Sequence, residues 1–263
     1  MNQTYLETAR LLTQVAPLVF ADDTFALKGG TAINLFVLQH DPGRSTSANQ
    51  RVPCASVYTL GEARLSNAIR WPGRSRDKIV CAKGESAAQA ALLAEMEIPV
   101  VSLEDMYGGK LVAALDRQHP RDLFDVMQLF EHDGITPEIR RAFVVYLASH
   151  HRPIHEVLNP PRRDIALEFK TAFQGMTADP IGLDDLLATR ERLISTLQRG
   201  LDNSERQFLL SLVKNVPDWG QLEIPHLEKL PGIRWKLQNL ARLREVDTEK
   251  HAEQYTSLAR LLA

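Results

Sequence analysis

The stretch VSLEDMYGGKLVAALDRQHPRDLFDV, residues 101–126, constrains the fold more than any other part of the sequence. Ser102, followed three residues later by Asp105, is typical of the first turn of a helix. The dipeptide His119-Pro120 ends that helix, because proline lacks an amide hydrogen and suits the first turn of a new helix. The sequence therefore predicts two consecutive helices with a short break between them.

The same stretch carries charged residues at helical spacing. Lys110 and Arg117 share one side of the first predicted helix, two turns apart, and Asp122 and Asp125 follow near the start of the second, with Arg121 beside them. We therefore expect the acids to return close to the bases and to form a candidate site. A simpler alternative leaves the acids as partners of a helix N-terminus and the bases on a solvated helix face.

A second candidate site lies closer to the N-terminus. Residues 24–27 read as a short strand and residues 32–38 as a helix, with two glycines and a threonine at the turn between them. Glycines let backbone N–H groups approach an anion, and a helix start carries a partial positive charge. This pattern favours a phosphate cradle made of Lys28, Gly29, Gly30 and Thr31, although glycines at an ordinary strand-to-helix turn look the same.

Composition excludes several classes of protein. The chain has 263 residues, of which 44% are hydrophobic and 24% charged, so it is long enough for one large core or two smaller ones. A net charge of -2 gives no global attraction for nucleic acid, so any such binding needs a local basic patch. Cys54 and Cys81 lack the spacing of a metal site and are expected to be free thiols.

The first twenty residues predict an amphipathic helix. Its apolar stripe recurs at helical spacing through residues 3–20. The segment lacks a basic start followed by an uninterrupted apolar run, so it does not read as a signal peptide, and we expect a cytoplasmic location.

The chain after Pro160-Pro161 shows helical periodicity almost throughout. The expected helices span residues 164–173, 183–201, 204–215, 230–243 and 248–262. Their basic residues could line an RNA groove near Trp219 and Trp235, although interspersed acids fit an ordinary mixed surface equally well. These basic residues are Arg190, Arg192, Arg199, Arg206, Lys214, Arg234, Lys236 and Arg242. A histidine cluster, formed by His150, His151 and His155, lacks the spacing of a closed metal site, so we expect surface or packing roles for it.

The segments FALKGGTAINLF and SLEDMYGGKLVAALDRQHPRDLFDV, in that order, resemble the AbiEii/AbiGii nucleotidyltransferase toxins. These toxins act in abortive infection, a form of phage defence, and in type IV toxin–antitoxin systems, and they belong to the DNA-polymerase-β-like nucleotidyltransferase superfamily. The later segments GITPEIRRAFVVYLASHHRPIHEVLNP and LPGIRWKLQNL are similar to that family too. The resemblance covers about residues 24–40 and 96–243.

This resemblance implies an α+β fold: a small mixed β-sheet nucleotidyltransferase core with flanking helices and a helical C-terminal bundle. We accordingly predict a nucleotidyltransferase-like domain over residues 1–158 and a helical domain over residues 159–263. The implied activity is transfer of a nucleotide from an NTP to an RNA acceptor, with tRNA the expected acceptor. A cognate antitoxin is the implied protein partner, and no membrane partner is expected.

The resemblance also assigns roles to the candidate residues. Lys110 and Asp122 map onto the family's conserved lysine and aspartate, so they are the expected catalytic residues: Lys110 neutralises phosphate and Asp122 orients or activates the acceptor hydroxyl. The expected nucleotide-binding residues are Lys28, Gly29, Gly30, Thr31, Arg117, Arg121 and Asp125. Mg²⁺ is the cofactor that the family implies.

One part of the family's pattern is missing. The family places two acids, D-x-D, on the strand after the Gly-Gly helix to hold Mg²⁺, whereas Thr46, Ser47 and Ala48 stand at that place here. Hydroxyl and methyl groups cannot replace carboxylates, because Mg²⁺ prefers anionic oxygen ligands. Unless the fold supplies Asp41, Glu62 or Asp77 instead, the alternative function is an inactive relative that retains nucleotide or antitoxin binding. A kinase-like phosphotransferase is a third possible class.

The departure from the family extends over residues 42–83. This segment has eight Lys or Arg residues against two acids and shows neither strand alternation nor a helical stripe. Three interpretations stay open: a basic insert that binds RNA, a divergent loop, and a segment translated in a shifted reading frame. The third arises because codons for residues 44–47 can read as Val-Asp-Ile in another frame.

Overall fold

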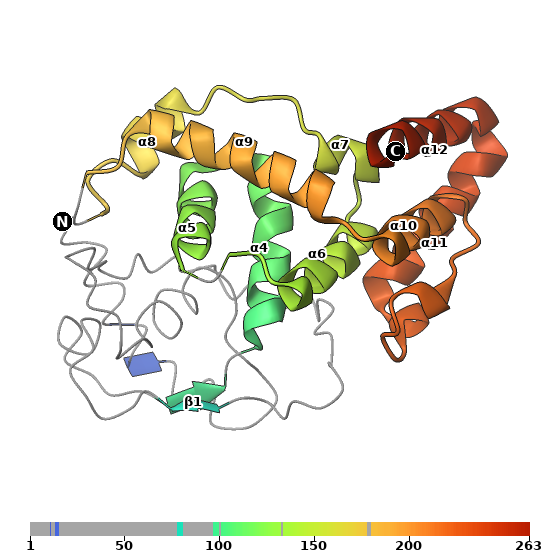
Figure 1. Cartoon of the computed structure of the whole chain (residues 1–263), viewed down its shortest axis with the longest axis horizontal. Coiled ribbons are helices and arrows are strands. Elements are labelled where there is room, and N and C mark those ends of the chain that lie inside the picture. Colours follow the sequence, from blue (N-terminus) through green and yellow to red (C-terminus); the bar gives the residue numbers. More distant parts are fainter. Residues whose placement is uncertain are drawn as a thin grey trace.

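The computed structural model describes residues 101–263 apart from residues 133, 178 and 179, and it also describes a few residues nearer the N-terminus (Figure 1). These are the helical residues Leu11, Gln14 and Val15 and the backbone of residues 78–80 and 97–99. The phosphate cradle, the stretch at residues 46–48 and the apolar stripe of the first predicted helix lie outside the described residues.

Helices dominate the described part of the chain. The helices and short 3₁₀ turns are α4 (Leu103–Arg117), α5 (Pro120–Glu131), α6 (Pro137–Ser149), α7 (Ile154–Leu158), α8 (Ala166–Ala172), α9 (Leu183–Gly200), α10 (Asn203–Val213), η3 (Trp219–Gln221), η4 (Leu227–Lys229), α11 (Pro231–Val246) and α12 (Thr248–Leu262). None of them has the length and apolar character needed to span a bilayer.

Local signals in the sequence set where these helices begin. The Ser102 hydroxyl accepts a hydrogen bond from the amide of Asp105 at 3.3 Å, which caps α4. Proline occupies the first turn of α5 and of α6, and Thr136 caps α6. The predicted break at His119-Pro120 is confirmed, because α4 ends at Arg117 and α5 begins at Pro120. The predicted C-terminal helices are also confirmed, within a few residues at each end.

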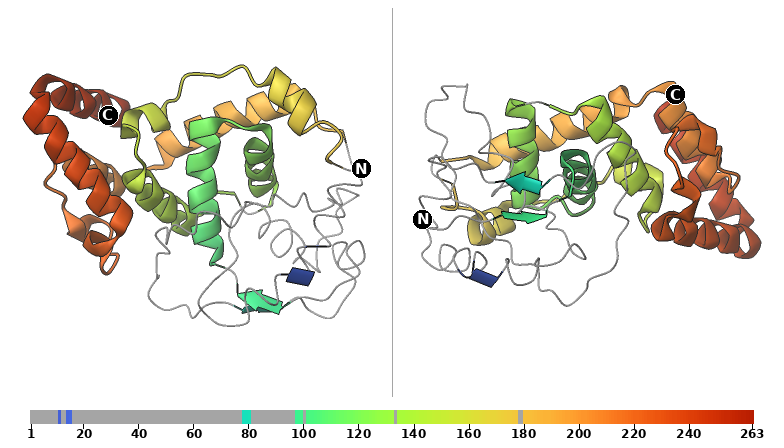
Figure 2. Two further views of the ribbon diagram at one scale, coloured as in Figure 1. Left: turned by 180° about the vertical axis from the view of Figure 1, so that it is seen from behind. Right: turned by 90° about the horizontal axis from the view of Figure 1, so that it is seen from below.

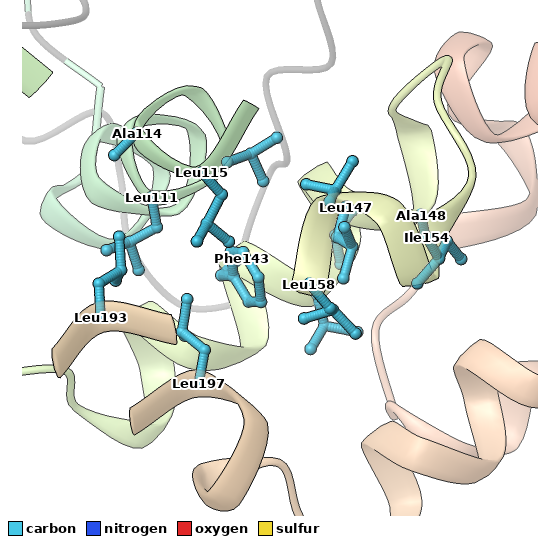
Figure 3. Close-up of a cluster of buried hydrophobic side chains, with 14 of the residues drawn as sticks. Leu111, Ala114, Leu115, Phe143, Leu147, Ala148, Ile154, Leu158, Leu193 and Leu197 are labelled. Carbon is cyan, nitrogen blue, oxygen red and sulfur yellow. The ribbon is translucent and has the colours of Figure 1, made fainter. Parts of the chain in front are cut away.

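Helices α4 and α6 are the most closely packed pair in the described fold. A Cβ atom placed on Gly108 of α4 would lie 2.8 Å from the Cβ atom of Ala142 of α6, so only glycine permits this approach. The Tyr146 hydroxyl of α6 also donates a hydrogen bond to the Asp105 carboxylate of α4. The apolar core spreads outward from this pair towards α7 and α9 (Figure 3).

The remaining helices surround this pair. Helix α9 lies across α5 and α4, whereas α10, α11 and α12 gather at the opposite end of the helical assembly from α8 (Figures 1 and 2). One hydrophobic cluster joins residues on both sides of the predicted boundary between residues 158 and 159, including Phe143 and Leu193. The division into two domains at that boundary remains a prediction.

The predicted α+β fold with a mixed-sheet core is wrong for the described part of the chain. The β-structure there is a single antiparallel pair, β1 (Lys78–Val80) and β2 (Glu97–Pro99), with Ile79 opposite Ile98. The core instead runs between helices, because apolar residues recur at helical spacing in each long segment after Ser102. Residues 98–101 of the sequence read as a short strand, and β2 overlaps the first two of them, whereas no pattern in the sequence predicts β1.

Candidate functional site

The break between α4 and α5 brings the predicted charged residues together. Gln118 adopts a left-handed backbone conformation with φ of 51°, which turns the chain so that α5 returns beside α4. Lys110 Nζ then lies 2.9 Å from Asp122 Oδ1 and 2.9 Å from Asp125 Oδ2. The prediction that these residues meet is therefore confirmed by their geometry.

Arg117 completes this cluster from the last turn of α4. Its Nε lies 2.6 Å from Asp122 Oδ2 and its second terminal nitrogen lies 3.1 Å from Asp122 Oδ1, so the guanidinium binds both carboxylate oxygens. The Asp122 side chain is 3% exposed and that of Arg117 is 45% exposed. Arg117 therefore connects a buried carboxylate to the surface of the molecule.

The alternative that places the bases on a solvated face is wrong for Lys110, which is 7% exposed. Burial alone would lower the pKa of Lys110, but attraction to Asp125 and Asp122 outweighs it and raises that pKa above its usual range. Burial likewise opposes the charge of Asp122, yet Lys110 and Arg117 hold the pKa of that carboxyl below its usual range. Lys110 and Asp122 are thus both charged at neutral pH.

His119 and Arg121 are close in sequence but have other partners. His119 Nδ1 accepts the amide hydrogen of Arg121 at 3.2 Å and so caps α5, and burial lowers the pKa of His119. The Nε of Arg121 donates to the carbonyl of Ala172 at the end of α8, at 2.9 Å. A role for Arg121 in nucleotide binding remains a prediction.

Gln118 is a residue that the sequence reasoning missed. Its side chain is fully buried; Nε2 donates to the carbonyl of Pro161 at 2.8 Å, and Oε1 accepts from the amide of Arg163 and from the guanidinium of Arg190, both at 3.1 Å. The amide therefore fastens the α4–α5 turn to the linker before α8 and to α9. No local pattern predicts this, because its partners are more than forty residues away.

The histidine cluster is packed against charged neighbours. The rings of His150 and His151 lie 4.4 Å apart, and His150 Nε2 lies 3.6 Å from Asp116 Oδ2. Burial, the largest effect, lowers the pKa of His150 to about 4. Within the described ranges, no three histidine, cysteine or acidic residues are arranged to hold a metal ion.

The other half of the predicted site lies outside the described residues. This applies to the nucleotide-binding residues Lys28, Gly29, Gly30 and Thr31 and to the possible substitute acids Asp41, Glu62 and Asp77.

Comparison with known proteins gives one match. The family described as "Nucleotidyl transferase AbiEii toxin, Type IV TA system" matches residues 65–239, a range that holds both strands and the whole Lys110 cluster. The range begins after the predicted phosphate cradle and includes the later part of the basic segment. No curated protein and no solved structure matches the chain. Because the match spans well over half of the sequence, the chain belongs to the AbiEii family of nucleotidyl transferase toxins of type IV toxin–antitoxin systems.

Proposed function

We propose that this protein transfers a nucleotide from an NTP to an RNA acceptor, with tRNA as the expected acceptor, and that a cognate antitoxin restrains it. In this reaction an acceptor hydroxyl oxygen bonds to the α-phosphorus, and the bond from that phosphorus to the bridging oxygen breaks. Pyrophosphate leaves with the bonding electrons, and the hydroxyl proton passes to solvent. The observation that carries the proposal is the buried Lys110 cluster within the range matched by the family.

The charge and exposure of each residue in this cluster indicate a different role for it. Arg117 is the most accessible cation, so its guanidinium is the group that meets the triphosphate. Lys110 keeps its proton at every physiological pH and adds positive charge beneath that position. The lowered pKa of Asp122 makes it a poor proton acceptor, so its role is to orient Arg117 and the acceptor hydroxyl.

The described acids do not fit a magnesium site. Asp122 is bound by Lys110 and Arg117, and Asp125 is bound by Lys110, so neither supplies the free anionic oxygen that Mg²⁺ prefers. We therefore derive no catalytic step through a metal ion held by these residues.

The same observation favours a second candidate function, an inactive relative that binds nucleotide or antitoxin. The sequence lacks the family's D-x-D acids, and the described carboxylates of the cluster are already neutralised. This candidate predicts nucleotide binding without transfer.

The two candidates are separated by one experiment. The full chain is incubated with each α-labelled NTP, Mg²⁺ and total tRNA, beside the variants Arg117→Gln, Lys110→Ala and Asp122→Ala. Arg117→Gln is the most informative, because that side chain is half exposed and its loss leaves the Lys110–Asp122 pair in place. Arg140→Gln is the matched control, because Arg140 forms a similar ion pair with the buried Glu205 between α6 and α10.

The transferase proposal is supported if the unchanged protein and Arg140→Gln label the RNA and Arg117→Gln does not. Nucleotide bound by equilibrium dialysis with no label transferred would support the inactive relative. Equal labelling by Arg117→Gln and the unchanged protein would rule out the proposed role of this cluster.

A further inference from the structure

Helix α11 has a packed side and an open side. Ile233, Lys236 and Leu240 are buried on the packed side, where α11 contacts α6 and α12. On the other side lies a run of exposed residues that we call the α11 outer face, formed by Arg234, Trp235, Gln238, Asn239 and Arg242. Residues three, four and seven positions apart on a helix share one side, so these five form a continuous strip.

Trp235 is the most unusual member of this strip. Its side chain is 61% exposed, although tryptophan is normally among the well-buried residues. Trp219, by contrast, packs against the core, with its ring centre 6.2 Å from that of Phe208. Since Ile233 and Leu240 already provide the apolar contacts of α11, Trp235 is not required for packing.

The structure also reduces the number of candidate RNA-binding residues among the eight basic residues named from the sequence. In the described fold, five of these eight side chains are buried or already contact other groups of the protein. Arg190 and Arg206 donate to backbone carbonyls, Arg192 and Lys214 lie over aromatic rings, and Lys236 is buried.

Arg234 and Arg242 are different. Within the described part of the chain their guanidinium groups form no ion pair and no hydrogen bond, and they lie on the same strip as Trp235. An exposed aromatic ring with unpaired arginines on either side is the arrangement that binds single-stranded nucleic acid, through base stacking and phosphate contacts. The amides of Gln238 and Asn239 between them can donate and accept hydrogen bonds with base edges.

The strip is rigidly placed relative to the Lys110 cluster. Lys236 Nζ donates to the carbonyls of His150 at 3.0 Å and Arg152 at 2.6 Å, so α11 is fastened to the loop after α6. Helix α6 packs tightly on α4, which carries Lys110. The α11 outer face and the Lys110 cluster therefore belong to one packed unit. A long substrate that binds at one place and reacts at another needs two sites with such a fixed relative position.

We propose that the α11 outer face binds a single strand of the RNA acceptor, with a base stacked on Trp235 and phosphates on Arg234 and Arg242. The choice of RNA rests on the proposed function, whereas the choice of a single strand rests on the exposed ring and the unpaired guanidinium groups.

Binding is measured without transfer, by fluorescence anisotropy of a labelled short oligoribonucleotide of mixed sequence, with the full chain, EDTA and no NTP. We expect Trp235→Ala to weaken binding about tenfold and Trp235→Tyr to keep most of the affinity, because stacking needs an aromatic ring. We expect Arg242→Gln to reduce the slope of log affinity against log salt by about 0.7, the value for one phosphate contact on a single strand. An unlabelled duplex of the same sequence should compete poorly.

Two matched controls keep the test specific. Arg141→Gln removes an exposed arginine from α6, and Leu167→Ala removes a 70% exposed apolar side chain from α8, at the opposite end of the helical assembly. Both should stay within about twofold of the unchanged protein.

Equal RNA affinity for Trp235→Ala and the unchanged protein would overturn the inference, as would a similar loss in either control. Weakened binding in the strip variants of a protein that transfers no nucleotide would uphold the inference while the proposed function fails. If the unchanged protein and Trp235→Ala transfer nucleotide equally well at limiting RNA, the proposed function is upheld and the inference fails.

Discussion

Single residues in this fold carry charges where the surroundings disfavour them. Lys110 stays protonated because two carboxylates surround it. Lys236 is at least as buried, and within the described part of the chain its hydrogen-bond partners are only carbonyl oxygens. Attraction to Asp125 and Asp122 raises the pKa of Lys110, and burial lowers the pKa of Lys236 to about 8. Protonation of the lysine side chain therefore stabilises the fold at Lys110 and destabilises it at Lys236.

We predict that Lys110→Ala destabilises the fold by about 3–5 kcal/mol, because it leaves the buried carboxylates of Asp122 and Asp125 without their shared cation. Asp125→Asn should cost less, because Lys110 keeps Asp122 as a partner. The measurement is urea unfolding followed by circular dichroism at pH 7. Lys250→Ala, at an exposed position of α12, is the control and should change stability by less than about 0.5 kcal/mol. A loss for Lys110→Ala no larger than the control's would contradict the prediction.

Lys236 predicts a rise in stability with alkaline pH. Between a pKa of about 8 in the folded chain and 10.5 in the unfolded chain, the unfolded chain binds a proton that the folded chain has released. The free energy of unfolding therefore increases with pH across this window, by about 3 kcal/mol in total. Unfolding in urea from pH 7.5 to 10 measures the slope, and Lys236→Met should remove it. An unchanged slope in that variant would assign the effect to another group.

At the scale of whole elements, the fold depends on how closely α4 and α6 approach. We predict that Gly108→Ala destabilises the protein by about 1–3 kcal/mol, because the new methyl group would lie 2.8 Å from Ala142 Cβ and 2.9 Å from its backbone. Gly200→Ala is the matched control at the end of α9, where a Cβ atom would meet only Arg140 Cδ at 3.8 Å. The control should be neutral or slightly stabilising, as alanine usually is in a helix. Thermal unfolding of both variants measures the difference, and equal melting temperatures would refute it.

Elements also show what the sequence can and cannot predict. The helix start at Ser102 was predictable, because a cap and its partner are three residues apart. The meeting of Lys110 with Asp122 was readable for the same reason, since the intervening break is short. The contacts of Gln118 with Arg190 and of Lys236 with His150 were not, because each joins residues far apart in the chain. Strand β1 was missed because three residues are too few to show alternation.

At the scale of the molecule, the hydrophobic cluster is continuous from Met106 to Leu262 within the described part. Leu193 and Leu197 of α9 face Leu111 and Leu115 of α4 across this core (Figure 3). Such packing favours one cooperative unit, whereas the predicted division at residues 158 and 159 would allow the two halves to unfold separately.

Hydrogen exchange of Leu193→Ala distinguishes these outcomes. The substitution removes buried methyl groups and should cost about 2–5 kcal/mol. If the described helices form one unit, the slowest amides of α4 lose as much protection as those of α9, because both exchange only when the shared core opens. Leu11→Ala, at a 58% exposed position, is the control and should leave protection in both helices unchanged. Protection lost in α9 but kept in α4 would show two independent units and would support the boundary at residue 158, since α4 would then remain folded after α9 has opened.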